Sequence, residues 1–586
     1  MIKEEKRRLL RQLWSIAGPY QRLFLFAFLL NFLVLFTDLF RPLLQLTAIE
    51  NIGAGDKGGL YFAAKLLLGV ILLDYLARSG YSYIFSNALL GTINRVRIKV
   101  FNHVLSMKMA FFDRQPVGSL LTRTINDCEA LGETLRAGAA TIVMDLTSII
   151  VTFVVLVKIN AELSAYLLLA GPPLLFVVRW CGRKLREKFM DVRKHLARSN
   201  GFMAEGIVGV EILQLFGQRS SSSEAYVEIN RAYRKATIIN NYYDALLYAL
   251  IDGIAALATA TILFVAFDLR FGVVDVATAI VFLTQIERIF NPIRQFSSKV
   301  AVLQQAMAAI ERIFSLLNDN TKIPQGAVQL NSKHLVINFK QVSFKYSQDG
   351  PTVLNDICFT VRPGQTLALV GQTGSGKSTI AKLLTRAYDG YQGSIDVDGH
   401  ELATLNYHSL RGHIAIVHQD VELFPGTLQD NISMFNNDID QEQIVRAIGL
   451  VKATHMVEQL PGGLDFQITE GGGNLSTGQK QLIVFARALA HDAPVVLMDE
   501  ATSSVDSVTE AWIQEAIAAI MQFKTVIVVA HRLSTIAAAD NILVLKNGNI
   551  IEQGDHQELL SLEDGYYASL IEASKLQSGE EVTLLR

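Results

Sequence analysis

The sequence contains Gly371-Gln372-Thr373-Gly374-Ser375-Gly376-Lys377-Ser378-Thr379, and this stretch decides the fold of the second half of the chain. It matches the pattern G-x-x-x-x-G-K-[ST], whose glycines let backbone N–H groups surround a polyphosphate at a helix N-terminus. The apolar run 366–370 precedes it and the helical pattern 380–384 follows it, as the motif requires. A glycine-rich turn is the alternative, but Lys377 and Ser378 are what a site for a nucleoside triphosphate and Mg²⁺ needs. We therefore predict an α/β nucleotide-binding domain.

A second nucleotide motif, Val495-Val496-Leu497-Met498-Asp499-Glu500, is an apolar run that ends in two carboxylates. Such a strand delivers Asp499 to the phosphate loop, where it holds the hydration shell of Mg²⁺. It also places Glu500 beside the γ-phosphate, where it polarises an attacking water. A buried strand with solvated acids at its end is the plainer interpretation. Because the phosphate loop lies in the same half of the chain, we favour hydrolysis of a nucleoside triphosphate.

The composition indicates a protein with a large membrane part. At 586 residues the chain is long enough for several domains, and its 50% hydrophobic content lies above that of ordinary soluble proteins, with the excess in the first half. Six stretches are predicted to span a bilayer as helices. The first begins at Leu23, and the others are centred in 60–85, 137–157, 163–180, 245–267 and 274–293.

Charge and cysteine content exclude some functions. The net charge of −2 gives no reason to expect a nucleic-acid partner. Cys128, Cys181 and Cys358 are widely spaced and form no metal-ligand pattern, so we interpret them as reduced packing residues. The charged start of the chain precedes an amphipathic piece that we expect on the inner membrane surface, and no cleavable signal peptide is expected.

The distribution of basic residues predicts the orientation in the membrane. Segments 91–108 and 179–198 are rich in Lys and Arg, whereas the turns 51–58 and 158–162 carry one lysine each. Both chain ends are therefore expected in the cytoplasm. The patterns between the spans predict helices that extend far into the cytosol and are joined in pairs by short turns.

The composition changes near residue 320, where strand patterns and Gly-rich turns begin after a polar linker at 318–326. We predict an all-α transmembrane domain of six spanning helices over residues 1–320. An α/β P-loop nucleotide-binding domain is predicted over residues 321–586. The fold class is thus multi-domain.

Between the two nucleotide motifs stands Leu475-Ser476-Thr477-Gly478-Gln479, which resembles the Leu-Ser-Gly-Gly-Gln signature of ATP-binding cassette (ABC) transporters. Other positions match the family in order. Tyr346 resembles the aromatic residue that stacks on adenine, and Gln419 resembles the Q-loop glutamine. Ser503-Ser504-Val505-Asp506 resembles the D-loop, and His531 resembles the switch histidine that contacts the γ-phosphate.

The membrane half carries a resemblance of its own. Residues 111–127 and 202–218 resemble the first and second intracellular loops of ABC exporters with six long helices per half. The resemblance covers about residues 10–575 and implies the exporter fold, in which the fourth and fifth helices are swapped between subunits. Phe424, after the Q-loop, would touch the membrane domain.

The resemblance implies a set of roles for the site residues. Glu500, His531 and Gln419 are the catalytic candidates, and Ser378, Gln419 and Asp499 are the candidates for Mg²⁺. ATP would contact Tyr346, the loop 371–379 and Asp499. The signature residues Ser476, Thr477, Gly478 and Gln479 would complete the ATP site of a second cassette, so the implied partner is a second half-transporter.

One residue departs from the family pattern. Thr477 replaces a glycine at the third signature position and adds a β-branched side chain near the partner's γ-phosphate. Since Glu500, His531 and the phosphate loop are intact, we favour a heterodimer whose other subunit supplies a regular signature. A homodimer that tolerates Thr477 is the alternative.

Charged residues within the predicted spans are the candidates for a transport pathway, because charge at that depth is costly unless it is paired or faces water. They are Asp38, Asp74, Arg78, Asp145, Glu287 and Arg288. Asp74 and Arg78 lie four residues apart, so an internal ion pair is an equally good interpretation for them. Glu287 and Arg288 point about 100° apart on a helix, so at most one is expected to line the pathway.

These observations predict a multi-pass protein of a bacterial inner membrane. It is expected to be an ATPase that exports amphipathic substrates, whether drugs, lipids or peptides, by alternating access. Import of a small molecule such as a siderophore with the same fold is one alternative. An ATP-gated channel or regulatory subunit is another, which the intact Glu500 and His531 disfavour.

Overall fold

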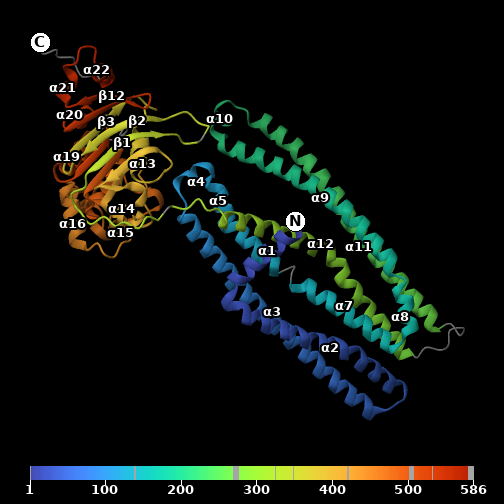
Figure 1. The fold of residues 1–586 in the computed structure, drawn as a ribbon. Coiled ribbons are helices and arrows are strands. Elements are labelled where there is room, and N and C mark those ends of the chain that lie inside the picture. The colour runs from blue at the N-terminus through green and yellow to red at the C-terminus, as the bar shows by residue number, and fades with distance from the viewer. Residues whose placement is uncertain are drawn as a thin grey trace. The chain divides into compact units, whose positions relative to one another are not determined.

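The computed structural model describes most of the chain, and Figure 1 shows its course. The described residues are 2–136, 140–267, 276–323, 325–347, 349–418, 421–499, 507–530 and 532–578. They form two units. The first, here the helical unit, comprises Met1–Leu105 and Pro116–Asp319, and the second, here the cassette, comprises Ser106–Gln115 and Asn320–Arg586.

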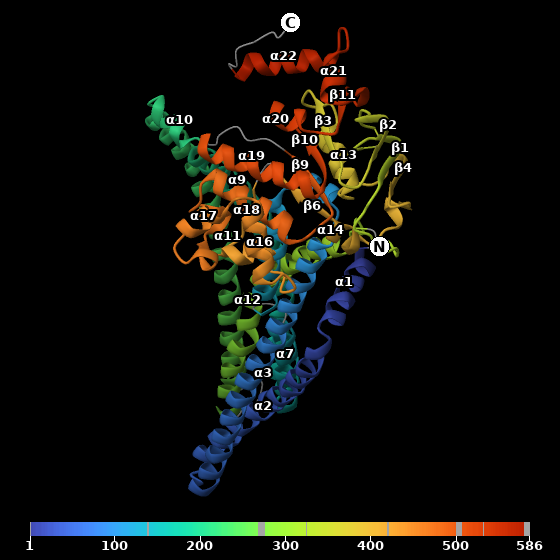
Figure 2. The same cartoon turned by 90° about the vertical axis from the view of Figure 1, so that its left-hand side faces the viewer.

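Helices make up the helical unit. Short elements are α1 (Ile2–Ile16), η1 (Gly18–Tyr20), α5 (Val117–Leu121), the π-helical turn η2 (Thr122–Asn126), α6 (Asp127–Thr134), α8 (Ala161–Leu168) and α10 (Val210–Leu215). Long elements are α2 (Gln21–Gly53), α3 (Lys57–Leu105), α7 (Ala140–Ile159), α9 (Gly171–Val208), α11 (Arg219–Phe267) and α12 (Val276–Leu317). In Figures 1 and 2, α2 runs beside α3 and α9 runs beside α11.

Four stretches of helix among the described residues are long and apolar enough to cross a membrane: Gly18–Gly53, Lys57–Leu105, Ala161–Val208 and Arg219–Ala266. They coincide with four of the predicted spans. The predicted spans 137–157 and 274–293 begin on residues outside the described ranges and continue as α7 and α12.

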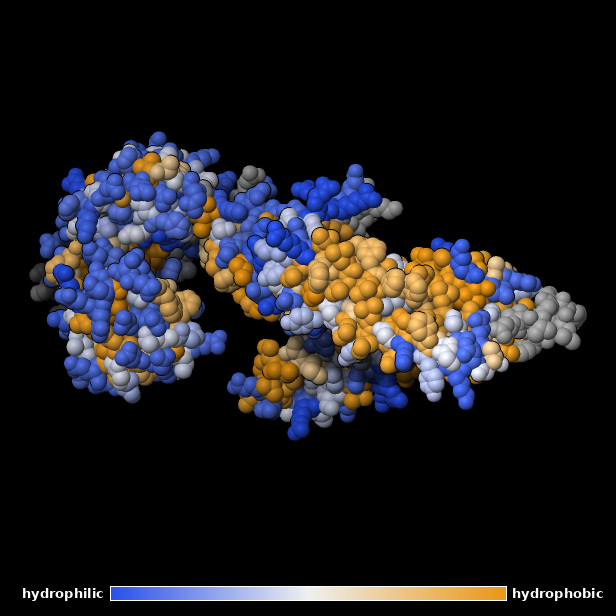
Figure 3. All heavy atoms as spheres, turned by 90° about the horizontal axis from the view of Figure 1, so that it is seen from below, coloured by the Kyte–Doolittle hydropathy of each residue, from blue (hydrophilic) through white to orange (hydrophobic). Residues whose placement is uncertain are grey.

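Figure 3 shows apolar side chains gathered over the helical unit. Large apolar side chains turned outward at this density suit contact with lipid.

The interior of the helical unit is apolar where α7, α8, α9, α11 and α12 meet. Leu156, Leu163, Ile251, Ile262 and Phe282 are fully buried there and belong to one cluster. Because the cluster also contains Leu174 and Cys181 of α9, it joins all five helices and fixes them against one another.

The first intracellular segment is interrupted between α3 and α5, where the sequence predicts a short turn between long helices. After α3 ends at Leu105, the chain forms a β-bridge between Met107 and Lys322, and Lys108 Nζ pairs with Asp389 at 2.9 Å. The short helix α4 (Met109–Arg114) follows and ends before Pro116. A proline disfavours helical backbone in the residue before it, which accounts for the break. These contacts make residues 106–115 part of the cassette.

Two main sheets build the cassette. An antiparallel sheet has the order β2 (Leu354–Val361), β1 (Ile337–Phe344), β4 (Gln392–Val397) and β5 (His400–Glu401). The larger sheet has the order β12 (Asn549–Gly554), β11 (Asn541–Lys546), β3 (Thr366–Gly371), β10 (Thr525–Val529), β9 (Val495–Asp499) and β6 (Ile414–Val417). All its neighbours are parallel except β11 with β12. β7 (Gly426–Thr427) pairs with β8 (Gln467–Ile468).

Helices flank these sheets in Figures 1 and 2. They are α13 (Lys377–Leu384), α14 (Tyr407–His413), α15 (Leu428–Ser433), α16 (Gln441–Leu450), α17 (Thr454–Gln459), α18 (Thr477–Ala490), α19 (Ser507–Phe523), α20 (Leu533–Ala537), α21 (His556–Leu560) and α22 (Tyr566–Ser578), with the single turns η5 (Leu402–Thr404), η6 (Gly463–Asp465) and η7 (Glu470–Gly472).

Strand β3 shows how the cassette core is divided. Its side chains alternate between two hydrophobic clusters: Ala368 and Val370 belong to one, Leu367 and Leu369 to the other. A parallel strand covered on both faces reads as a continuous apolar run, which is what the sequence shows before the phosphate loop. The helical unit with its cassette is the fold class expected from the sequence.

The cysteines allow a direct test of burial. Cys128 and Cys181 are buried, whereas Cys358 is exposed. Burial raises the pKa of the Cys128 thiol to about 11, which leaves little thiolate at neutral pH. We expect N-ethylmaleimide at pH 7.5 (roughly one unit below an ordinary thiol pKa) to label Cys358 alone in the folded protein. Mass spectrometry of tryptic peptides measures this, and rapid labelling of Cys128 would contradict the structure.

Candidate functional site

The phosphate loop lies between β3 and α13, and its backbone requires glycine. Gly371 and Gly376 have φ of 151° and 106°, in the region that favours glycine. A Cβ on Gly371 would lie 2.2 Å from the carbonyl oxygen of Leu545, and one on Gly376 would lie 2.5 Å from Leu354 Cδ2. The loop is therefore a close-packed cradle whose backbone leaves no room for side chains at these two positions.

Lys377 begins α13 and turns back over the loop. Its Nζ donates to the carbonyl oxygens of Gly371 at 2.6 Å and of Gln372 at 3.0 Å. Burial lowers the pKa of this ammonium group, and the charge of Asp499 opposes that effect. The hydroxyl of Ser375 is buried and has no hydrogen-bond partner among the described residues. An ammonium, an unpaired hydroxyl and loop amides suit a polyphosphate.

The strand register brings Asp499 to the edge of the sheet from which the phosphate loop emerges. Asp499 pairs with Val529 of β10, and Val529 pairs with Leu369 of β3. Two interstrand steps correspond to about 10 Å, and the influence of Asp499 on Lys377 agrees with this proximity. Ser378 is exposed at the start of α13. A hydroxyl and one carboxylate are ligands that suit Mg²⁺, which keeps several waters.

Tyr346 is partly exposed and forms part of an aromatic cluster beside the loop. Its hydroxyl lies 3.0 Å from Thr379 Oγ1, and its ring packs edge-on against Tyr388, with centroids 4.9 Å apart. Lys382 Nζ lies over the Tyr346 ring at 5.8 Å. The contact with Tyr388 was not predicted, because no motif spacing marks that residue.

The signature segment caps α18. Ser476 Oγ accepts from the Gln479 N–H at 3.2 Å, and Gln479 Oε1 accepts from the Ser476 N–H at 2.9 Å. This reciprocal capping box was not predicted, although the spacing Ser-x-x-Gln indicates it. Gly478 is buried, whereas Ser476 and Thr477 are exposed. The exposed N-terminus of α18 presents amides and the partial positive charge of a helix start.

The remaining predicted catalytic positions fall outside the described residues. These are Gln419, Glu500, the segment 503–506 and His531. The described strands β6, β9 and β10 end at or shortly before three of them, at Val417, Asp499 and Val529.

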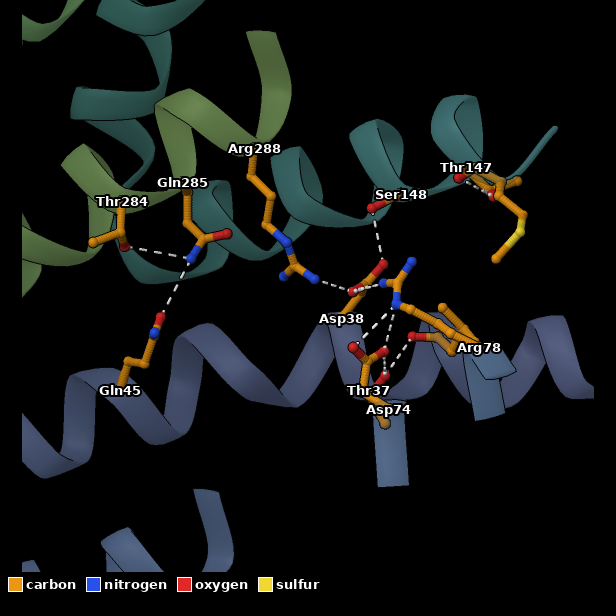
Figure 4. Close-up of polar contacts among 12 residues, drawn as sticks. Thr37, Asp38, Gln45, Asp74, Arg78, Thr147, Ser148, Thr284, Gln285 and Arg288 are labelled. Atoms are coloured by element: carbon orange, nitrogen blue, oxygen red, sulfur yellow. Dashed lines mark hydrogen bonds and ion pairs between the residues drawn. The ribbon is translucent and has the colours of Figure 1, made fainter. Parts of the chain in front are cut away.

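A second site lies in the helical unit, where a buried carboxylate joins four helices (Figure 4). The side chain of Asp38 on α2 is 1% exposed. It accepts from Arg78 Nη2 of α3 at 2.9 Å and from Ser148 Oγ of α7 at 2.8 Å, and it also pairs with Arg288 of α12. Arg78 donates to Asp74 at 2.9 Å as well. Asp38 therefore pairs with two guanidinium groups, one of which Asp74 also pairs with, on a helix long and apolar enough to cross a membrane.

This network borders a cavity of about 260 Å³. Asp38, Asp74, Arg78, Asp145 and Arg288 line it. Five of the six charged residues singled out in the sequence thus meet in one place. Arg288 lines the cavity, whereas Glu287 is exposed and does not line it. Asp145 pairs with Lys299, whose part was not predicted.

The fold and both sites define a P-loop ATPase joined to membrane-spanning helices. The family model of the ABC transporter transmembrane region matches residues 24–293, and that of the ABC transporter cassette matches residues 354–503. The chain belongs to the ABC transporter family. It is a multi-pass membrane protein of the exporter half-transporter type, an ATPase coupled to transport.

Similar proteins cover nearly the whole chain. The chain is 30% identical over 569 residues to the ABC transporter ATP-binding protein YfiC of Bacillus subtilis strain 168, covering 96% of this chain and 94% of that protein. It is 32% identical over 577 residues to the ATP-dependent lipid A-core flippase of Sodalis glossinidius, covering 97% and 98%. The solved structure of a bacterial Atm1-family ABC exporter with ATP bound has a TM-score of 0.77 and 26% identity, covering 96% of this chain and 99% of that one.

Proposed function

We propose that the chain exports amphipathic molecules by alternating access, driven by ATP bound and cleaved between two cassettes. The preformed phosphate loop, with Lys377 buried over it, is the observation that carries the proposal. The similarity to a lipid A-core flippase and to a probable multidrug resistance transporter, YheH of Bacillus subtilis, supports amphipathic cargo. ATP that binds the closed pair of cassettes better than the open pair drives the change of access.

Within this proposal the site residues take separate roles. Loop 371–379 and Lys377 hold the phosphates, and Tyr346 holds the adenine ring. Ser378, Asp499 and Gln419 would hold Mg²⁺, which when bound neutralises charge that develops on the phosphates. Glu500 polarises the attacking water, and His531 contacts the γ-phosphate. Release of the γ-phosphate then lets the cassettes separate.

The turn between α9 and α11 supports the need for a second subunit. It carries large apolar side chains that are exposed in the chain, here called the apolar tip: Ile207, Val208, Val210, Ile212, Leu215 and Phe216. An exposed apolar patch on a turn marks an interaction site. Phe424 and Phe435 of the cassette are exposed as well, with ring centroids 6.4 Å apart. We propose that the apolar tip of one subunit binds the Phe424 region of the other.

Polar substitution of the apolar tip is expected to reduce transport while the cassettes still cleave ATP. Leu215 and Phe216 are 76% and 75% exposed, so Leu215→Ser with Phe216→Ser leaves the folded chain intact. We expect transport to fall by about 10-fold or more, as for loss of a hot spot of ~1.4 kcal/mol or more. Val227→Ser, an exposed apolar position on α11, is the matched control. Normal transport by the double variant would contradict the proposed contact.

Thr477 supports a heterodimer, in which this chain supplies the intact phosphate loop and the other subunit supplies the regular signature. Affinity purification of the tagged chain from native membranes is expected to recover a second half-transporter. In a reconstituted homodimer, Thr477→Gly is expected to raise ATP turnover, because it removes a side chain from the N-terminus of α18. An active transporter that contains this chain alone would overturn the heterodimer.

One experiment tests both the direction of transport and the membrane in which the protein lies. We propose an inner-membrane protein with both ends in the cytoplasm. Inside-out vesicles should then accumulate a fluorescent amphiphile when ATP is added, with inhibition by vanadate and loss in Glu500→Gln. Accumulation by right-side-out cells instead would indicate import.

A further inference from the structure

The cavity that Asp38 lines has a size that suits the polar headgroup of an amphiphile. Its volume of about 260 Å³ lies just below the ~300–1,000 Å³ of pockets for drug-sized ligands. It is bordered by α2, α3, α7 and α12. An acyl chain has no place among charged side chains, whereas a small polar group does.

The charges around this cavity do not balance. Asp38 and Asp74 pair with Arg78 and Arg288, and Asp145 pairs with Lys299. Arg41 also lines the cavity, and no carboxylate among the described residues pairs with it. With Lys299, which pairs with Asp145 but does not line the cavity, the group holds four cations and three carboxylates. Arg41 is the cation left over, and an unpaired cation within a membrane-spanning helix is costly.

Two buried polar atoms of the lining are left without partners among the described residues. Nη1 of Arg288 has none, although its Nη2 pairs with Asp38. Asn31 is 4% exposed, and its side-chain Oδ1 has no hydrogen-bond partner among the described residues. A guanidinium N–H seeks an acceptor, preferably an anion, and an amide oxygen seeks a donor. A ligand that pairs with both atoms would carry negative charge and an O–H or N–H.

We propose that this cavity binds the anionic headgroup of the transported amphiphile, a phosphate or a carboxylate, through Arg41 and Arg288, with Asn31 accepting from a hydroxyl or amine of the same headgroup. The inference rests on the proposed export function and names the substrate class. Both cations lie on helices that also hold the Asp38 network, so the bound anion shares Arg288 with Asp38.

A shallow, largely apolar surface of α3 lies next to the cavity. The hollow over it has a volume of about 810 Å³, and Ser79, Ser82 and Ser86 supply hydroxyl groups to it. Arg78 lines both this surface and the cavity. This surface, apolar with a few hydroxyl groups, adjoins the headgroup site at Arg78.

Binding in nanodiscs without ATP tests the proposal. The probes are dodecyl phosphate, dodecanoate, dodecanol and dodecyltrimethylammonium, measured by titration calorimetry on the full chain. We expect the two anions to bind at least about 10-fold more tightly than the neutral and cationic probes, as for a charge-assisted contact. A preference for the phosphate that Asn31→Leu removes identifies a protonated phosphate as the headgroup, a preference for dodecanoate identifies a carboxylate, and equal binding of both anions shows that the site recognises the negative charge alone. Equal binding of all four probes, or no binding, overturns the proposal.

Arg41→Gln is the decisive variant, because it breaks no ion pair in the described structure. We expect it to reduce binding of the anions by about 10-fold without affecting the neutral probe. Arg294→Gln is the matched control, since it removes a cation from α12 that pairs with Asp252 and does not line the cavity. If Arg41→Gln and Arg294→Gln behave alike, the proposal is wrong. Because no ATP is present, these outcomes are independent of whether the chain transports.

Discussion

Replacement of Lys377 by alanine is expected to lower ATP hydrolysis by about 100-fold or more at saturating ATP, the scale of losing one preorganised electrostatic contact. The ammonium group lies 2.6 Å from the carbonyl oxygen of Gly371, directly over the phosphate cradle. Burial lowers its pKa, so the site has already lost much of the hydration of this charge before a phosphate binds. Phosphate release measured on purified protein, with or without a companion subunit, gives the rate.

The control for this variant is Lys340→Ala. Lys340 lies on β1 of the antiparallel sheet, is largely exposed and pairs with Asp396 away from the phosphate loop. Its removal should leave hydrolysis within about 2-fold of the wild type, as expected for a surface ion pair. If Lys377→Ala keeps wild-type hydrolysis, the loop at 371–379 is not the nucleotide site.

Asp38→Ala is expected to destabilise the helical unit by about 3–5 kcal/mol, the usual cost of removing one partner from a buried ion pair. Asp38 accepts from Arg78, Arg288 and Ser148, so its loss leaves the guanidinium of Arg288 without its ion-pair partner at membrane depth. Titration with dodecyl sulfate measures the effect through the reactivity of the buried thiols Cys128 and Cys181, in a Cys358→Ser background.

Two further variants separate the charge from the packing. Glu287→Gln removes an exposed carboxylate from α12 and should be neutral within about 0.5 kcal/mol. The double variant Asp38→Leu with Arg288→Met should recover most of the lost stability, because apolar pairs replace buried ion pairs without penalty. An Asp38→Ala protein as stable as the wild type would show that the network does not form.

The cassette could be predicted closely because the residues that form its phosphate loop are neighbours in the sequence. The phosphate loop must follow a strand and precede a helix within a few residues, so the pattern at 371–379 specifies both the elements and the site. Packing partners were less accessible: the contact of Tyr346 with Tyr388 depends on where α13 ends, and no spacing records it. The capping box of Ser476 and Gln479 is local as well and could have been read from its spacing.

The helical unit could be predicted in its spans but not in its interior. Length and hydropathy identify spanning helices because the bilayer sets both. The partners of Asp38 come from three other helices, and which faces of those helices meet depends on packing that a single sequence does not display. The cost of charge in a membrane identified the candidate residues, and all of them except Glu287 are paired or line the cavity.

Reconstitution of the chain into liposomes, with any subunit that co-purifies with it, tests the central claim most directly. ATP hydrolysis and uptake of a fluorescent anionic amphiphile are measured together on the wild type and on Lys377→Ala. We expect ATP-dependent uptake that vanadate blocks and that disappears, together with hydrolysis, in the variant. Hydrolysis without movement of any solute, or uptake that does not require ATP, would contradict an ATP-driven exporter.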